Sequence, residues 1–453
     1  MWRNTKPKAN SGSTSPIVHE DIVYDTPKGL CKLWETYYKE LLNEQPNETA
    51  QYDNIHHSAI RSHVEYLTGS FNTDDDATGT LAEEFTINEI ASICKNLPNN
   101  KSPGYDRITN ECLKYGGYAL YAILCNIYNA IIEYGYIPPG LKHSIVIPLY
   151  KGKNKPKTAL NSYRGVSLTP TLNKVLEKLV LCRLKPWLDK QDFPPPLQQA
   201  GRKGTNCVSP AYAVQEAIHY VTSQNTKVYG CFLDIQSAYD VINWHGLLYK
   251  MALIGIKDKL WHLFRVWLFG STAQILVHGQ SSDIFDISRS IKQGGLLSTL
   301  YFVAFYYDIH RNVKEGPTQS LTFHDIDIAS PTMADDTLLV STSVKGLQLM
   351  IDNAFNYATR WRFTYSPNKS KCITFGESRA RHTINKEKRR WYLGAVALEE
   401  VDHYTYLGIV MSSDGSSTRR TQVMARRGYS SFGILKSSGF HSDGLSPITC
   451  SII

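Results

Sequence analysis

The sequence predicts an α+β fold, in which helices and strands alternate without a regular βαβ rhythm. Three observations predict this class. The 453 residues are 42% hydrophobic and 20% charged, which is enough apolar sequence for a large core and too little charge for a disordered chain. Segments of helical spacing alternate with short β-branched runs. No segment repeats at a fixed period, so a solenoid or propeller is not expected.

The helices are predicted from apolar residues that recur at intervals of three and four. The helix near residue 86 begins with Thr86 and Glu89, a capping box in which each side chain bonds the backbone N–H of the other residue. The long helix after residue 109 must end before Pro138, because proline cannot continue a helix. Helices are expected at residues 28–43, 86–97, 109–134, 170–188, 211–223, 245–268, 297–313, 347–361 and 419–435.

The strands are predicted from short runs of β-branched and aromatic residues. Strands are expected at residues 143–151, 227–235, 273–291, 321–342, 371–375 and 403–410, with two strands in each of the longer ranges. The polar segments 1–20 and 72–80 are predicted to be an unstructured end and a linker.

The charge and cysteine content restrict the class of protein. A formal net charge of +8 fits a polyanionic partner such as nucleic acid, although many proteins without one are equally basic. The nine cysteines form no CxxC pair and no secretory signal is present, so we expect reduced thiols in an intracellular protein of the nucleus or cytoplasm. No uncharged run reaches the roughly 18 residues of a membrane span, so no membrane partner is expected.

Three acids lie in apolar, strand-like sequence. Asp234 ends the run 227–235, and Asp335 and Asp336 lie between apolar residues of the range 321–342. Burying ionised carboxylates without a partner is very costly, so these acids indicate a bound cation. Mg²⁺ is the natural candidate, because hard divalent ions prefer oxygen ligands. The alternative is that Asp335 and Asp336 only form a hairpin turn, which favours Asp, and that Asp234 only ends a strand.

The segments around these acids resemble the reverse transcriptases of non-LTR (LINE-type) retrotransposons. The palm motifs of that family are matched in order at residues 232–244, 291–302 and 333–341. Further segments resemble its two fingers blocks, the block after the catalytic hairpin, the primer grip and the opening of the thumb, at residues 99–117, 145–180, 366–375, 404–415 and 418–435. The similarity covers most of residues 28–435.

The resemblance implies a right-hand polymerase fold. Residues 1–84 would be an N-terminal extension with a helix and a linker, and residues 85–226 the fingers. Residues 227–415 would be the palm, built on an antiparallel sheet and with fingers elements inserted, and residues 416–453 a truncated start of the thumb. The chain would then be a fragment of a longer element product. Its implied activity is RNA-directed DNA synthesis from dNTP on a primer 3′ end, with an RNA template, a DNA primer and no stable protein partner.

The resemblance also implies a two-metal site. Asp234 and Asp335 would ligate both Mg²⁺ ions, with Asp336 and the backbone carbonyl of Ile235 as further ligands, and Mn²⁺ as a substitute ion. Two such ions about 4 Å apart activate a hydroxyl and stabilise an in-line phosphoryl displacement. Tyr239 would pack under the incoming sugar and exclude a 2′-hydroxyl. The alternative for Tyr239 is simple core packing.

The remaining implied site residues would bind substrate. Gln293 and Gly294 would lie under the nascent base pair, Lys151 and Arg164 would contact the triphosphate, and Lys369 would donate a proton to pyrophosphate. The alternatives are an ordinary turn for Gln293 and Gly294, and solvated surface charges for Lys151 and Arg164.

Basic clusters near the C-terminal end have two interpretations. They would grip the phosphates of the template and primer, or they form a solvated face. These clusters are residues 386–390 and Arg419, Arg420, Arg426 and Arg427. For the whole chain, two other functions stay open: a catalytically inactive or co-opted nucleic-acid-binding remnant of the same fold, and another polymerase of that fold.

Overall fold

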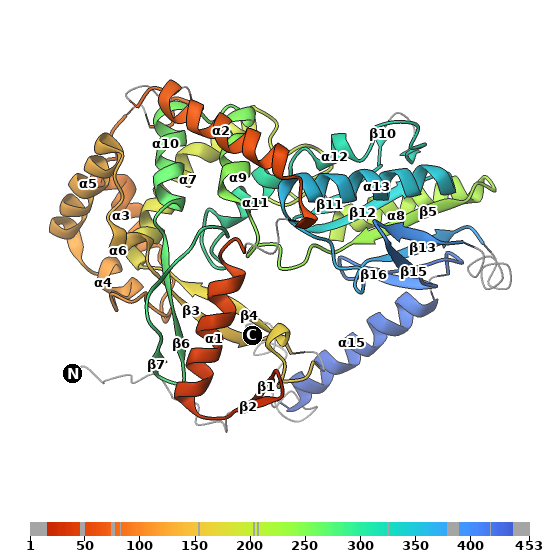
Figure 1. The fold of residues 1–453 in the computed structure, drawn as a ribbon, viewed down its shortest axis with the longest axis horizontal. Helices are drawn as coiled ribbons and strands as arrows, with labels where there is room; N and C mark the ends of the chain where they lie inside the picture. Colours follow the sequence, from red (N-terminus) through yellow and green to blue (C-terminus); the bar gives the residue numbers. More distant parts are fainter. Residues whose placement is uncertain are drawn as a thin grey trace, which may run out of the picture. The chain divides into compact units, whose positions relative to one another are not determined.

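The structure, a computed structural model, divides by its contacts into two compact units that are each discontinuous in sequence (Figure 1). The first unit comprises Met1–Pro194, Ser237–Tyr307 and Thr359–Phe363. The second comprises Pro195–Gln236, Asp308–Ala358 and Thr364–Ile453. The structure describes residues 16–45, 50–73, 78–81, 83–152, 155–202, 204–205, 208–323, 326–377, 389–416 and 418–437. The four regions expected from sequence remain a prediction.

A six-stranded sheet forms the centre of the second unit. Its strand order is β11-β12-β5-β13-β15-β14, and every neighbouring pair is antiparallel except β13 with β15. The strands are β5 (Val228–Leu233), β11 (Thr332–Met333), β12 (Asp336–Ser341), β13 (Lys371–Phe375), β14 (Trp391–Leu393) and β15 (Val396–Glu400). All six residues of β5 are buried, because strands pair with it on both edges and helices cover the sheet.

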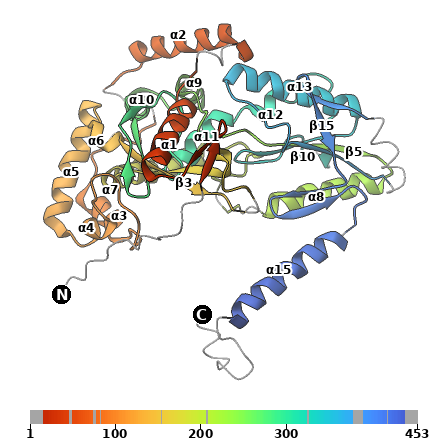
Figure 2. The ribbon, with the colours of Figure 1, turned by 60° about the horizontal axis from the view of Figure 1, so that its bottom comes forward.

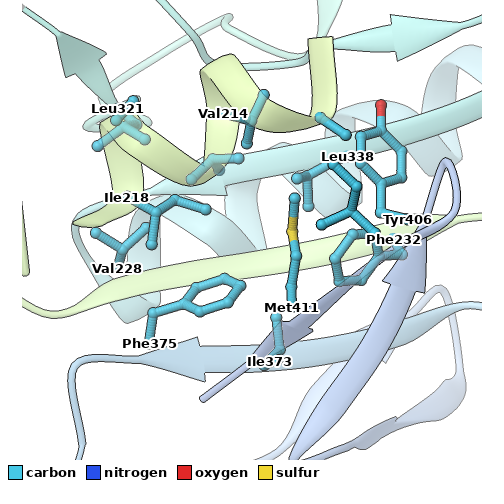
Figure 3. Packing of buried hydrophobic residues seen from close by; sticks show 14 residues of the cluster. Val214, Ile218, Val228, Phe232, Leu321, Leu338, Ile373, Phe375, Tyr406 and Met411 are labelled. Carbon is cyan, nitrogen blue, oxygen red and sulfur yellow. The ribbon is translucent and has the colours of Figure 1, made fainter. Parts of the chain in front are cut away.

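Two helices cover opposite faces of this sheet (Figure 2). They are α8 (Val208–Ser223) and α13 (Val344–Trp361), of which residues 344–358 belong to the second unit. On the α8 face, Val214 and Ile218 pack toward Phe232 and the side chains of β13 (Figure 3). The hairpin of β16 (His403–Tyr406) and β17 (Ile409–Ser412) completes this apolar cluster. Burial of these side chains holds the central strands in one register.

Further elements complete the second unit. They are α12 (Ile309–Asn312), the hairpin of β9 (Thr322–Phe323) and β10 (Ile326–Asp327), and α15 (Thr418–Ser437). No helix in the part of the chain that the structure describes has both the length and the apolar sequence needed to span a bilayer.

The first unit has its own sheet, in the order β4-β3-β6-β7, with β8 also paired to β6. Its strands are β3 (Ser144–Tyr150), β4 (Tyr163–Leu168), β6 (Thr272–Val277), β7 (Gln280–Ser281) and β8 (Phe285–Asp286), with a separate hairpin of β1 (Ile17–His19) and β2 (Ile22–Tyr24). Its helices are α1 (Pro27–Leu41), α2 (Asn54–Ser70), α3 (Ile87–Lys95), α4 (Asn110–Lys114), α5 (Gly117–Tyr134), α6 (Pro139–Lys142), a 3₁₀ turn (Leu160–Ser162), α7 (Thr171–Lys190), α9 (Trp244–Ile254), α10 (Asp258–Leu268) and α11 (Ser298–Tyr306).

Three helices predicted as continuous are broken. The range 109–134 divides at Gly116 and Gly117, the second of which has φ +76°. The range 245–268 divides at Gly255, with φ +98°, and the range 297–313 divides after α11. Glycine adopts a positive φ without steric cost, so both glycine breaks have a local cause.

Other predictions fail because tertiary contacts decide the local structure. Residues 1–20 were expected to be unstructured, but Ile17–His19 form β1. Helix α2 and strands β4, β14 and β15 were not predicted. Residues 1–15, residues 74–77 of the expected linker and residues 386–388 of a basic cluster lie outside the described residues.

Candidate active site

The three acids singled out by sequence lie at adjacent ends of two paired strands. Asp234 directly follows β5, and Asp336 begins β12. The antiparallel register pairs Leu233 with Thr337, so the end of β5 lies beside the start of β12. Asp335 belongs to the tight turn that joins β11 to β12. Strand pairing therefore brings together acids that are about 100 positions apart in sequence.

A loop before β13 holds Asp234 from the other side. The N–H of Asp234 donates to Ser370 Oγ at 3.2 Å, and its carbonyl oxygen accepts from the N–H of Ser366 at 2.7 Å. Lys369 Nζ lies 2.7 Å from Asp234 Oδ2, so the structure brings these two predicted residues into an ion pair. Ile235 is buried and bridges to Tyr365 in the same loop.

The electrostatics of the cluster show that the carboxylates repel one another. Burial raises the pKa of the Asp335 carboxyl, and the charge of Asp234 raises it further. Burial, followed by the charges of Asp335 and Asp234, raises the pKa of Asp336 to about 6. Lys369 opposes both increases. Added positive charge would favour the ionised form of such carboxylates and would lower their pKa values again.

The donor chemistry of this cluster fits a hard divalent cation, because its ligands are carboxylate oxygens. Within the described ranges, however, no three His, Cys, Asp or Glu side chains are grouped as closely as a metal ion requires. The agreement with a metal site therefore lies in the carboxylate chemistry of Asp234, Asp335 and Asp336 and in the strand pairing that brings them to one end of the sheet.

Gln198 is a residue of this region that sequence reasoning missed. Its side chain, which is fully buried, bonds the backbone of Ala334 in the turn before Asp335. Nothing local in the sequence indicates this role, since the contact spans 136 positions. Ser370 was missed as well, because its hydroxyl accepts a bond from the backbone N–H of Asp234, which is also 136 positions away.

The other predicted site residues lie in the first unit. The Tyr239 ring stacks on Phe302 with ring centroids 5.4 Å apart and planes 7° apart. The Gln293 carbonyl accepts from the N–H of Ser167 in β4 at 2.9 Å. Gly294 has φ +115°, and a Cβ there would lie 3.3 Å from the carbonyl oxygen of Ser167. The conformation and the limited space at Gly294 both favour glycine.

Asp240 is the partner of Gln293 and was also missed. The Gln293 amide nitrogen lies 3.0 and 3.1 Å from the two Asp240 carboxylate oxygens. Burial raises the pKa of the Asp240 carboxyl to about 6, although Gln293, Lys151 and Arg289 each lower it. Lys151 Nζ donates to the carbonyl of Asn161 at 2.9 Å. The signal available in the sequence was a second acid within the 232–244 segment.

Arg164 lies on β4 opposite Leu149, with an exposed side chain. Of the basic residues expected near the C-terminal end, Arg426 is exposed on α15, whereas the side chains of Arg419, Arg420 and Arg427 lie outside what the structure describes. Arg389 is not a surface charge, since it forms ion pairs with Glu377 and Glu400. The expectation that Arg389 grips phosphate or faces solvent is therefore wrong.

Comparison with known proteins connects this geometry to a family. A family model described as "Reverse transcriptase (RNA-dependent DNA polymerase)" matches residues 153–411. The chain is 27% identical over 390 residues to the "RNA-directed DNA polymerase from mobile element jockey" of Drosophila melanogaster. The matched region covers 83% of this chain and 40% of that protein. The chain is 26% identical over 332 residues to the "Probable RNA-directed DNA polymerase from transposon X-element" of the same organism, covering 71% of this chain and 34% of that protein.

A solved structure of apo telomerase from Candida tropicalis, truncated from its C-terminal domain, is similar with a TM-score of 0.41 and 11% identity. The similarity covers 65% of this chain and 59% of that one. The chain spans no more than about 40% of the length of the two mobile-element relatives.

Proposed function

We propose that this chain, a member of the reverse transcriptase (RNA-dependent DNA polymerase) family in its non-LTR branch, extends a DNA primer along an RNA template with dNTP. The observation that carries this proposal is the cluster of Asp234, Asp335 and Asp336 at the paired ends of β5 and β12. The primer 3′-hydroxyl would attack the α-phosphate of the dNTP, and pyrophosphate would leave.

Asp234 and Asp335 would be the principal metal ligands, with Asp336 and the carbonyl of Ile235 as further ligands. Two Mg²⁺ ions, or Mn²⁺ as substitutes, would supply an activated hydroxyl and neutralise charge on the leaving group. The raised pKa values of Asp335 and Asp336 support this assignment, because they show that the cluster favours added positive charge. Alignment of the reactants and electrostatic stabilisation would supply most of the rate.

The substrate contacts follow from the remaining residues. Lys369 would donate a proton to pyrophosphate, and its ammonium already lies beside the acids, 2.7 Å from Asp234. Lys151 and Arg164 would contact the triphosphate. Gln293 and Gly294 would lie under the nascent base pair, where a glycine permits close approach of the backbone. Tyr239 would exclude ribonucleotides through the bulk of its ring, which stacks on Phe302.

In the right-hand description, the sheet with β5 and β12, which is antiparallel except for the pair β13–β15, would be the palm, within residues 227–415. Residues 85–226 would be the fingers, preceded by the N-terminal extension 1–84. Helix α15 would open the thumb, within residues 416–453. The mixed helix and sheet content of the chain agrees with this family fold.

Primer extension on poly(A)–oligo(dT) with Mg²⁺ tests the proposal. We expect Asp234→Ala and Asp335→Ala to reduce extension by at least about a thousandfold, because each removes a group that stabilises developing charge. Circular dichroism should show that both variants stay folded. Asp283→Ala, which removes an exposed carboxylate between β7 and β8 of the first unit, is the matched control and should extend normally.

Two results would contradict the proposal. Undiminished extension by either active-site variant would remove the catalytic assignment. Binding of the RNA–DNA hybrid in a gel shift, without incorporation by the unmodified chain, would instead favour a nucleic-acid-binding remnant of the fold.

A further inference from the structure

Gln198 lies against the outer edge of the hairpin that carries Asp335 and Asp336. Residues 197–199 run parallel to Thr332 of β11 and form an isolated bridge with it. The N–H of Thr332 donates to the carbonyl of Leu197, and the N–H of Gln199 donates to the carbonyl of Thr332, both at 2.9 Å. This segment therefore places the Gln198 side chain beside the β11–β12 turn with little freedom to move.

The Gln198 amide bonds both polar groups of one turn residue. Its Oε1 accepts from the N–H of Ala334 at 2.9 Å, and its Nε2 donates to the carbonyl of Ala334 at 3.1 Å. Oε1 also accepts from the N–H of Ala200 at 3.1 Å. Two N–H groups face the oxygen and one carbonyl faces the nitrogen, so the orientation of the amide is determined by its partners. The side chain has 0% exposure, so water does not compete for these bonds.

The turn that Gln198 contacts has an unfavourable backbone conformation. Ala334 has φ +56°, in the left-handed region that an alanine seldom occupies because its Cβ is crowded there. A turn of this kind persists only when its surroundings hold it. Asp335 is the next residue, so rotation of the Ala334 peptide planes would re-aim the Asp335 side chain.

We propose that Gln198 is a positioning residue for the metal-binding acids: its amide holds Ala334 in the left-handed conformation and thereby directs Asp335 toward Asp234. This inference rests on the proposed function, because that function supplies the bound metal ion. The bonds between Gln198 and Ala334 are observed independently of it. A plain packing role would require only the volume of the Gln198 side chain. The positioning role requires the amide, with its acceptor and donor in place.

Gln198→Met separates these two roles, because methionine keeps the volume and removes the amide. The direct measurement is Mn²⁺ binding to the full chain without nucleic acid or dNTP, followed by electron paramagnetic resonance. We expect binding to weaken by about 10- to 100-fold, as for other groups that orient metal ligands. Gln199→Met is the matched control, since that side chain does not touch Ala334, and it should bind Mn²⁺ as the unmodified chain does.

A second substitution tests the route of the effect. Ala334→Gly removes the steric cost of the positive φ, so the turn should depend less on its hydrogen bonds to the Gln198 amide. In the Gln198→Met background it should recover at least about threefold of the lost affinity, whereas alone it should change affinity little. If Gln198→Met fails to fold, Gln198→Asn, whose shorter amide cannot reach both groups of Ala334, allows the same comparison.

The outcomes separate this inference from the proposed function. Equal Mn²⁺ affinity in Gln198→Met and the unmodified chain would overturn the inference, as would an equal loss in Gln199→Met. Absence of Mn²⁺ binding by the unmodified chain at millimolar concentration would overturn it as well. Weakened Mn²⁺ binding in a chain that never extends a primer would support the positioning role and contradict only the polymerase assignment.

Discussion

Single residues near the predicted site are held in place by different kinds of contact. Asp234 is held at its backbone by Ser366 and Ser370 and at its carboxylate by Lys369. Tyr239, by contrast, has an aromatic support, since its ring lies nearly parallel to Phe302. A ring held in this way presents a fixed surface, which is what the discrimination of two sugars that differ by one hydroxyl requires.

We predict that Tyr239→Val admits ribonucleotides. Removing the ring removes the bulk that would clash with a 2′-hydroxyl, so the preference for dNTP over rNTP should fall by at least about tenfold, or 1.4 kcal/mol. Single-nucleotide incorporation of dTTP and UTP on a poly(A) template measures the preference. Tyr134→Val, at a 75% exposed tyrosine that ends α5, is the control. An unchanged preference in Tyr239→Val would show that the ring serves only core packing.

Among the elements, the far edge of the second unit's sheet is joined by a buried ion network. The Arg389 guanidinium bonds both Glu377, at 3.0 and 2.9 Å, and Glu400, at 3.1 and 2.6 Å. Trp391 Nε1 and Thr374 Oγ1 also donate to Glu400, at 2.9 and 2.8 Å. These bonds join β13, β14 and β15. Through β13, which pairs with β5, they connect the edge of the sheet to its centre.

Glu400→Gln should therefore destabilise this sheet. The substitution removes one negative partner of Arg389, whose side chain is 11% exposed, and should lower the free energy of unfolding, measured in urea, by about 3 kcal/mol. Glu399→Gln is a control one position away, because Glu399 pairs with Lys371 on the surface and is 63% exposed. That pair contributes about 1 kcal/mol or less. Similar losses of unfolding free energy in the two variants would show that the buried network stabilises the sheet no more than the surface pair does.

For the whole molecule, a buried and a half-buried histidine contribute a loss of stability in mild acid, whereas the carboxyls of Asp240 and Asp336, whose pKa values are raised to about 6, contribute a gain. Burial lowers the pKa of His310 to about 4 and that of His245 to about 4. Each ring therefore stays neutral in the folded chain at pH values where it is charged in the unfolded chain. His310 is 8% exposed, and its Nδ1 lies 3.0 Å from Ser330 Oγ. Its Nε2 has no hydrogen-bond partner among the residues that the structure describes, so a second proton there would be left unpaired.

We predict that His310 contributes a loss of stability as the pH is lowered from about 6.5 to 4, opposite in sign to the contribution of Asp240 and Asp336. Above the ordinary histidine pKa of 6.5 both states are neutral and the stability is fully present. Below it the unfolded chain binds protons that the folded chain does not, so stability is lost until the folded pKa is reached. His310 alone accounts for about 3 kcal/mol. Urea unfolding at pH 7, 6, 5 and 4 measures the loss.

His310→Asn supplies the comparison for this pH series, because asparagine can bond Ser330 and does not titrate in this range. Its unfolding free energy should vary less with pH than that of the unmodified chain, although it is lower at pH 7. Parallel pH profiles for the two proteins would show that His310 does not carry the effect.

The sequence by itself determined the local features of this chain. The capping box of Thr86 and Glu89 forms as predicted, and α1, α7, β3, β5 and β13 lie close to their expected ranges, because caps and apolar periodicity act within a few residues. The resemblance to non-LTR reverse transcriptases is confirmed by the family match and by the mobile-element relatives.

Only the tertiary structure decided which distant groups meet. Pairing of β5 with β12 and β13 brings Asp234 to Asp335 and Lys369, and Gln198 reaches Ala334 across 136 positions. No local pattern encodes such contacts, because a buried side chain acquires its partner from strand register and packing rather than from its neighbours in sequence.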